Sequence, residues 1–330
     1  MKRNGWFFLL TALFVLIVPW PCLSIEKKII DFGPKLNLLN FYGVWANGEN
    51  NVWVVGNFGN IFHSKDGKIF KNQLSSVKSE LYDIGFANES RGWIVGRHGI
   101  ILMTEDGGRT WKIQKQPTKN SLFSLCVRDD RHAWAVGEWG TILHTNDGQT
   151  WVLQRKNVDF VLNDVSFVDL DYGWAVGEYG TILHTKDGGR SWVSQSSPWG
   201  KVTIFSVSFE NRSQGVISAM DGRMLVTTNG GRTWVQAKSP TNKTILSIQF
   251  VKGKVYGVGL EGTSIISADG GRSYSSLNLS SGFSQMAWFS RCRFVNGNVG
   301  WIVGGSGNIL QLLGGGKEWK RPEKLVFGNE

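Results

Sequence analysis

Residues 162–192 read LNDVSFVDLDYGWAVGEYGTILHTKDGGRSW, and this stretch decides the fold. It contains the short apolar runs LNDVSF, GWAVG and TILHT, and a fourth run begins at the closing Ser-Trp pair. Glycine-rich turns separate the runs, and short β-rich runs bounded by such turns predict strands joined as hairpins. The stretch therefore predicts one four-stranded antiparallel sheet.

The same pattern recurs along the whole chain. Residues 122–151 and 81–111 match it closely, and weaker copies occupy residues 41–70, 204–234, 245–274 and 288–319. Four-stranded sheets that repeat about every 40 residues are typical of β-propellers. We therefore expect an all-β, seven-bladed β-propeller of four-stranded antiparallel blades. Its repeats lie near residues 41–80, 81–121, 122–161, 162–203, 204–244, 245–287 and 288–326.

Tryptophan marks the register of the repeats. Ten of the sixteen tryptophans fall at two repeated positions, one in the second run and one at the end of the glycine turn. Large rings at equivalent points fill the wedge between twisted sheets. These residues are therefore expected to form the core between blades: Trp53, Trp93, Trp134, Trp174 and Trp301 in the second run, and Trp111, Trp151, Trp192, Trp234 and Trp319 at the closing position.

Before the closing aromatic residue stands a segment of the form S/T-x-D-G-G-x-T/S-W. Its aspartate can accept hydrogen bonds from the backbone of its own turn, and its glycines permit positive φ angles. Asn229 replaces the acid in the fifth copy without loss of the pattern. We therefore interpret the repeated acids as structural: Asp66, Asp106, Asp147, Asp187 and Asp269.

The N-terminus indicates export. Lys2 and Arg3 precede an apolar run over residues 6–18, which is shorter than the roughly 20 residues that span a bilayer. Residues 1–24 are expected to be a signal peptide and residues 25–330 the propeller, in the periplasm or thylakoid lumen, either free or associated with the membrane. A lipid anchor at Cys22 ranks second, and an uncleaved anchor third.

Charge and cysteine content restrict the function further. The formal net charge is +10, which suits anionic membranes or acidic partner segments, although ordinary solubility charge explains it nearly as well. Export disfavours a nucleic-acid partner. Cys126 and Cys292 belong to repeats three and seven, which are not neighbours in a ring, so we expect no disulfide framework.

The glycine-turn segments resemble the Asp-box, or BNR, repeat. The longer phrase G-W-x-V-G-x-x-G-x-I-L-x-T-x-D-G-G-x-T-W resembles the photosystem II stability and assembly factor family over residues 38–325, strongly in repeats two to four and weakly in repeat seven. The resemblance implies a seven-bladed, non-enzymatic propeller. It also implies binding of newly made membrane-protein subunits, notably the reaction-centre D1 protein in phototrophs.

A search for catalytic groups gives few candidates. Glu138 and Glu178 lie at equivalent hairpin tips, and Asp83 and Asp164 lie on innermost strands, as the two carboxylates of a glycosidase could. Repetition favours a local hydrogen-bonding role instead. No zinc-ligand spacing or phosphate-binding loop occurs. We expect no enzyme activity, no cofactor and no metal, and we interpret three equivalent histidines as packing residues: His63, His144 and His184.

The hairpins between second and third strands are the candidate docking surface. If the first strand is innermost, these tips share a face with the loops that enter each first strand. Blades one to four then carry an arc of ring-bearing residues, and the loops add a basic rim. The candidate partner-binding residues are Phe58, Arg97, His98, Trp139 and Tyr179 on the tips and Lys112, Lys115, Lys119, Arg155 and Lys156 around them.

These observations predict an exported, non-enzymatic, monomeric protein that acts as a scaffold or chaperone for membrane-protein subunits. A carbohydrate-binding or glycosidase-like Asp-box propeller is the alternative, with polysaccharide as the ligand, and the aromatic rings could instead serve only to pack the face together. Ring closure is open at this point: residues 318–325 or residues 28–32 could supply the outer strand of the last blade.

Overall fold

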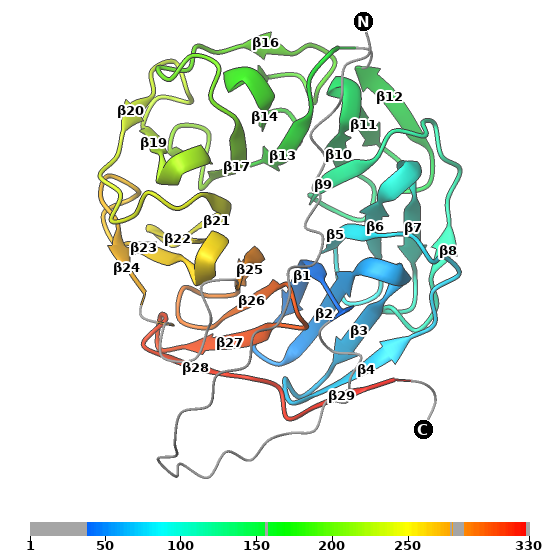
Figure 1. The fold of residues 1–330 in the computed structure, drawn as a ribbon. Coiled ribbons are helices and arrows are strands. Elements are labelled where there is room, and N and C mark those ends of the chain that lie inside the picture. The colour runs from blue at the N-terminus through cyan, green and yellow to red at the C-terminus, as the bar shows by residue number, and fades with distance from the viewer. Residues whose placement is uncertain (1–37, 156–157, 278, 280–286, 328–330) are drawn as a thin grey trace, which may run out of the picture. The chain divides into compact units, whose positions relative to one another are not determined.

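The computed structural model describes residues 38–155, 158–277, 279 and 287–327, and these form seven β-sheets arranged around an axis (Figure 1). The predicted seven-bladed propeller of four-stranded antiparallel blades is confirmed. In each blade the strands follow chain order from the axis outward, and the first strands of neighbouring blades contact one another. The expected signal peptide, Cys22 and residues 28–32 lie outside the described residues.

The strands of the first three blades begin near the repeat starts expected from the sequence. Blade one comprises β1 (Phe41–Asn47), β2 (Asn51–Gly56), β3 (Ile61–Ser64) and β4 (Ile69–Gln73). Blade two comprises β5 (Leu81–Phe86), β6 (Gly92–Gly96), β7 (Ile101–Thr104) and β8 (Lys112–Ile113). Blade three comprises β9 (Leu122–Val127), β10 (Ala133–Gly137), β11 (Ile142–Thr145) and β12 (Trp151–Arg155).

The other four blades repeat this arrangement. Blade four comprises β13 (Leu162–Phe167), β14 (Gly173–Gly177), β15 (Ile182–Thr185) and β16 (Val193–Ser194). Blade five comprises β17 (Ile204–Phe209), β18 (Gly215–Ala219), β19 (Met224–Thr227) and β20 (Val235–Gln236). Blade six comprises β21 (Ile245–Val251), β22 (Lys254–Gly259), β23 (Ser264–Ser267) and β24 (Ser275–Ser276). Blade seven comprises β25 (Phe289–Phe294), β26 (Gly300–Gly304), β27 (Ile309–Leu313) and β28 (Glu318–Lys320).

The second-strand tryptophans form the core between blades, as predicted. Trp174 in β14 is fully buried and stacks on Phe209 of the next blade, with ring centroids 3.5 Å apart and planes 8° apart. Its indole Nε1–H also donates to the carbonyl of Gly230, in the glycine turn of that blade, over 3.2 Å. Trp134 makes the same two contacts, with Phe167 and with the carbonyl of Gly188, so these two rings join neighbouring blades by stacking and by a hydrogen bond.

The ring is closed at the C-terminus by an arrangement that neither alternative anticipated. Residues 318–320 do form the outer strand of blade seven, as β28. The chain then continues into β29 (Lys324–Val326), which crosses to blade one and pairs parallel with β4 as a fifth strand. Leu325 and Val326 are buried there, and Leu325 belongs to the same apolar cluster as Phe70. The last blade is thereby tied to the first.

Removal of residues 323–330 is expected to lower the free energy of unfolding by about 3–6 kcal/mol, because two aliphatic side chains lose their burial. Amides of β4 should then exchange with deuterium faster than amides of β12. The measurement is denaturant unfolding together with hydrogen exchange. Removal of residues 328–330 alone is the control, and equal behaviour of the two truncated proteins would contradict a closing role for β29.

Candidate docking face and central axis

The hairpin tips and the loops that enter the innermost strands share one face, as the sequence predicts. The N–H of Glu138 donates to the carbonyl of Ser121, just before β9, over 3.0 Å. The N–H of Gly140, from the same tip, donates to the carbonyl of Phe160 in the loop that leads to the next blade, over 2.7 Å. Each tip is thus fixed to its own blade, and tips of this kind also hold the neighbouring blade.

The second residue of each tip has a left-handed backbone, with φ between 54° and 58°. This conformation costs a non-glycine residue about 1 kcal/mol, so it is held by the surrounding hydrogen bonds. In blades one to four the side chains here are exposed, by 62% for Phe58, 54% for Trp139 and 56% for Tyr179. His98 is exposed too, and within the described residues none of the four contacts another ring.

A second row of aromatic residues lies nearer the axis on the same face. Tyr42 stacks on Trp288 with ring centroids 6.1 Å apart, and it meets Tyr82 edge-on at 5.4 Å. Tyr82 in turn contacts Phe123 at 5.3 Å. Burial, with Glu80 nearby, raises the pKa of Tyr82 to about 12, so its hydroxyl stays neutral. Sequence reasoning missed this row, although an aromatic residue follows the first position of three successive repeats.

The predicted basic rim is only partly free. Arg97 pairs with Glu80 at 3.2 Å, and Arg155 lies over the Phe160 ring, with its guanidinium carbon 5.9 Å from the centroid. Lys112 differs from the expectation because it lies in the outer strand β8, opposite Met103, and not in a loop. Lys115 and Lys119 are exposed in the connection to β9. Lys156 lies outside the described residues.

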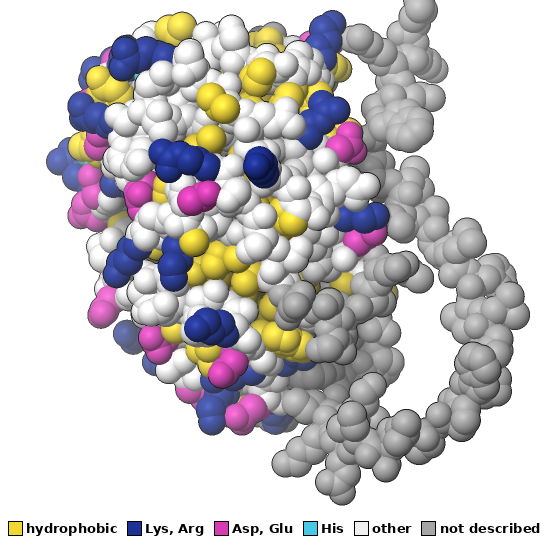
Figure 2. All heavy atoms as spheres, turned by 90° about the vertical axis from the view of Figure 1, so that its left-hand side faces the viewer, with side chains coloured by type: hydrophobic (Ala, Val, Ile, Leu, Met, Phe, Trp, Pro, Cys, Tyr) yellow, Lys and Arg dark blue, Asp and Glu magenta, His cyan; other side chains and the backbone are white. Residues whose placement is uncertain are grey.

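The outer side of the molecule near β19 to β24 has no large patch of a single charge in the view of Figure 2. Figure 2 shows Lys and Arg side chains scattered among Asp and Glu side chains in this view, with small separate hydrophobic spots. Interspersed charges of both signs are usual on a soluble surface. This side gives no reason to place a partner there.

The carboxylates considered for glycosidase chemistry have structural contacts. One oxygen of Glu138 accepts the N–H of Ser121 at 2.8 Å, and one oxygen of Glu178 accepts the N–H of Val161 at 3.0 Å. Both acids thus fasten the entry of an innermost strand to the tip of the same blade. The same arrangement thus occurs in blades three and four.

The Asp-box turns lie at the opposite ends of the strands, and each acid organises its own turn. Asp187 accepts the hydroxyl of Ser191 at 2.6 Å and the N–H of the same residue at 2.9 Å. These bonds lower the pKa of Asp187 to about 2. In this turn the carbonyl of Gly188 accepts a hydrogen bond from the indole Nε1–H of Trp134 in the preceding blade, over 3.0 Å.

A repeated glutamine reinforces the same contact, and sequence reasoning overlooked it. The side-chain amide of Gln154 donates to the Gly188 carbonyl at 3.1 Å, and Gln195 donates to the Gly230 carbonyl at 2.9 Å. Gln114 similarly reaches Gly148 and accepts from the closing ring Trp151 at 2.7 Å. The signal was available, because glutamine follows the closing aromatic residue by three positions in the first four repeats.

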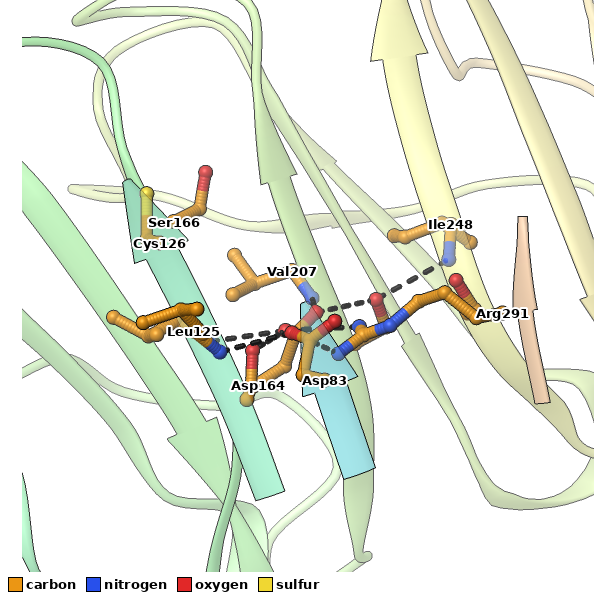
Figure 3. A network of polar contacts seen from close by, with 12 residues as sticks. Asp83, Leu125, Cys126, Asp164, Ser166, Val207, Ile248 and Arg291 are labelled. Carbon is orange, nitrogen blue, oxygen red and sulfur yellow. Dashed lines mark hydrogen bonds and ion pairs between the residues drawn. The ribbon is translucent and has the colours of Figure 1, made fainter. Parts of the chain in front are cut away.

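Three charged residues meet on the central axis, from blades two, four and seven (Figure 3). Arg291 of β25 donates to Asp83 of β5 at 2.6 Å and to Asp164 of β13 at 3.4 Å. Both acids are buried, and burial raises the pKa of Asp83 while Arg291 opposes that rise. The two acids were expected as a pair from the sequence, whereas Arg291, at the equivalent position of repeat seven, was not expected.

The acids of this axial ion pair network also bind backbone groups of the next blades. Asp83 accepts the N–H of Leu125 at 2.9 Å, and Asp164 accepts the N–H of Val207 at 3.0 Å. Asp164 further accepts the hydroxyls of Ser124 and Ser206, each at 2.6 Å. All these bonds cross from one blade to another, so the network connects blades and leaves neither acid free for catalysis.

The three equivalent histidines pack on the second-strand tryptophans of separate blades. Centroid distances are 4.2 Å for His63 on Trp53, 4.6 Å for His144 on Trp134 and 4.8 Å for His184 on Trp174. Burial lowers the pKa of each of the three to about 4. Within the described ranges, no group of three or more possible metal ligands gathers. The described residues likewise contain no helix long and apolar enough to cross a membrane.

The sequence model described as photosynthesis system II assembly factor YCF48 matches residues 70–155, 149–239 and 232–325, which is more than half of the chain. The chain belongs to this family. The membership confirms the resemblance carried by the glycine-turn phrase.

Solved structures agree on the fold. A structure titled "YCF48 bound to D1 peptide" is 20% identical with a TM-score of 0.60, covering 73% of this chain and 80% of that one. YCF48 from Cyanidioschyzon merolae is 17% identical with a TM-score of 0.70, covering 83% and 96%. Virginiamycin B lyase from Staphylococcus aureus is 11% identical with a TM-score of 0.67, covering 83% and 94%. No curated protein matches the chain.

These likenesses show the fold alone, because all three identities are low. An enzyme and a peptide-binding assembly factor stand side by side among the similar propellers. The fold alone therefore does not distinguish an enzyme from a peptide-binding protein. Evidence for either function has to come from the family and from the side chains of this chain.

Replacement of Arg291 by Met is expected to cost about 3–5 kcal/mol of stability, because two buried carboxylates lose their counter-ion. The free energy of unfolding in urea measures the loss. The triple variant with Arg291→Met, Asp83→Ser and Asp164→Ser should recover much of it, since serine occupies this position in blades three, five and six. A triple variant no more stable than Arg291→Met alone would contradict this account.

Acid should destabilise the folded protein through its stacked histidines. Their folded pKa of about 4 lies below the ordinary histidine pKa of 6.5, so the neutral form is the one that folding favours. This stability is present in full above pH 6.5 and declines as the pH falls toward 4. We expect the double variant His144→Phe, His184→Phe to lose less stability than wild type between pH 7 and pH 5. His98→Phe, on an exposed tip, should behave as wild type.

Proposed function

We propose that this protein is an exported, non-enzymatic scaffold or chaperone that binds an extended segment of a membrane-protein subunit on the tip face. The observation that carries the proposal is the arc of exposed rings on blades one to four. Phe58, Trp139 and Tyr179 keep more than half of their surface in solvent at structurally equivalent positions. A row of exposed aromatic rings leaves apolar surface in water, and such surface typically marks a site of recognition.

The inner row of aromatic residues supports the same surface. Tyr82 contacts both Tyr42 and Phe123 on the innermost strands, and the three rings form an apolar base beside the exposed arc. Lys115 and Lys119 add exposed cations in the connection beside it. An apolar centre with a charged rim suits an extended peptide that carries both aliphatic and acidic side chains.

Family membership supports the choice of partner. A related protein has been solved as "YCF48 bound to D1 peptide", and D1 is therefore the first partner to test for this chain. Export to the periplasm or thylakoid lumen, which the N-terminal sequence favours, would bring the tip face to the extramembrane segments of such a subunit. We propose that the protein acts as a monomer in that compartment.

A non-enzymatic role is supported by the engagement of the carboxylates. Glu138 and Glu178 bind backbone N–H groups, and Asp83 and Asp164 belong to the axial ion pair network. None of the four is a free acid beside a free base. Carbohydrate binding remains the second candidate, because Trp139 and Tyr179 are exposed on adjacent blades and sugars stack on such rings.

The test uses synthetic peptides that tile D1, labelled for fluorescence polarisation. The variant Arg97→Ala, Trp139→Ala, Tyr179→Ala is expected to bind roughly 30- to 900-fold more weakly, since its two aromatic anchors each contribute about 1–2 kcal/mol. Its melting temperature should stay near that of wild type, because the substituted side chains are exposed.

The matched control is Arg190→Ala, Val193→Ala, Val235→Ala, which removes three exposed side chains away from the tip face. It should bind peptide as wild type does. Peptide binding that survives in the tip variant would place the docking surface elsewhere. Retention of wild type on a polysaccharide column, lost in the tip variant, together with no peptide binding, would favour the carbohydrate function.

A further inference from the structure

The innermost strands line the axis in layers of equivalent residues. The first layer contains the axial ion pair network. The second layer lies two residues further along each strand, which is about 6.6 Å away. Its members, from blade one to blade seven, are Trp45, Gly85, Cys126, Ser166, Ser208, Gln249 and Arg293.

Blades three to six use this layer to hold the next blade. The Ser166 hydroxyl oxygen accepts the N–H of Phe209 at 3.3 Å, and the Ser208 hydroxyl oxygen accepts the N–H of Phe250 at 2.9 Å. Cys126 and Gln249 accept the equivalent N–H groups of Phe167 and Phe294. Each serine therefore uses an oxygen lone pair, while its hydroxyl hydrogen has no acceptor among the described residues.

Arg293 breaks this pattern because a guanidinium group can only donate. Its guanidinium carbon lies 3.9 Å from the centre of the Trp45 ring, and its Nε is buried with no hydrogen-bond partner. Trp45 Nε1 is also buried without a partner. Burial lowers the pKa of Arg293 to about 10, and the charge of Asp83 in the first layer opposes that fall. Unsatisfied buried donors of this kind call for an acceptor.

The first layer shows what an arginine at this point on blade seven can reach. Arg291, two residues earlier on β25, bonds to acids of blades two and four. Arg293 has no acid in its own layer, where blade two has Gly85 and blade four has Ser166. Figure 3 shows Ser166 and Cys126 together, to one side of the network formed by Arg291 and the two acids. The second layer thus has donors and a positive charge, and no described carboxylate of its own.

We propose that the second axial layer is a binding site for a small oxyanion, either an inorganic ion such as sulfate or a carboxylate. Arg293 supplies the charge, and the hydroxyls of Ser166 and Ser208 supply further donors. The first layer occupies the axis toward the tip face, so the anion enters from the Asp-box face. This site is separate from the tip face in the proposed function, and neither depends on the other.

The test measures melting temperature during titration with sodium sulfate and with sodium acetate, with sodium chloride holding the ionic strength constant. Wild type should show a saturable rise of several degrees for the oxyanion that fits. Arg293→Met should lose the saturable rise and keep only the general salt effect. The control Arg109→Met removes an exposed arginine of the blade-two Asp box and should respond as wild type does.

The two titrations separate the sources of the ligand, since a site for a terminal carboxylate responds to acetate and a site for inorganic ions responds to sulfate. A second measurement covers the case in which Arg293→Met does not fold. Crystals of wild type soaked in bromide should show an anomalous peak beside the Arg293 guanidinium. No saturable response to either anion, or equal responses in wild type and Arg293→Met, would overturn the proposal.

Discussion

Each blade of this ring has a free inner edge, and the whole structure depends on how that edge is satisfied. The first strand of each blade pairs with the second strand only, so the backbone N–H groups on its other edge need acceptors from outside the blade. The preceding blade supplies them through short polar side chains, as Asp83 does for Leu125 and Ser206 does for Ile248. The same bonds that satisfy the edge also fix the spacing of the blades, because each one crosses from one blade to the next.

The outer half of each interface is organised on the same principle with different groups. The Asp-box acid shapes a glycine turn, and the turn offers one carbonyl to a tryptophan and a glutamine of the preceding blade. Gly230 accepts both Trp174 and Gln195 in this way. Each turn therefore needs a side-chain oxygen at this position as an acceptor. Asn229 can replace the acid because its amide oxygen also accepts the N–H of Thr233.

The repeat made the fold predictable, and the contacts that cross between repeats were harder to predict. Periodic tryptophans and glycine turns gave the number of blades, the strand order and the face on which the tips lie. The role of Arg291 was not predicted because its acidic partners lie in repeats two and four, far from it in the sequence. Only the folded ring brings these three blades together on the axis. The role of β29 was also hidden, because a three-residue strand that pairs with a distant blade leaves no periodic signal.

Departures from the repeat indicate where this chain differs from a plain scaffold. On the tip face, blades one to four carry rings, whereas blades five and six carry Asp221 and Glu261 at the same left-handed position. The backbone there is equally constrained in both halves, so packing does not account for the difference in side chains. On the axis, blade seven replaces the usual acceptor by a donor in two successive layers. The first replacement is compensated by two acids. The second stacks on the Trp45 ring but leaves its Nε without a hydrogen-bond partner, and an anion would supply the missing acceptor.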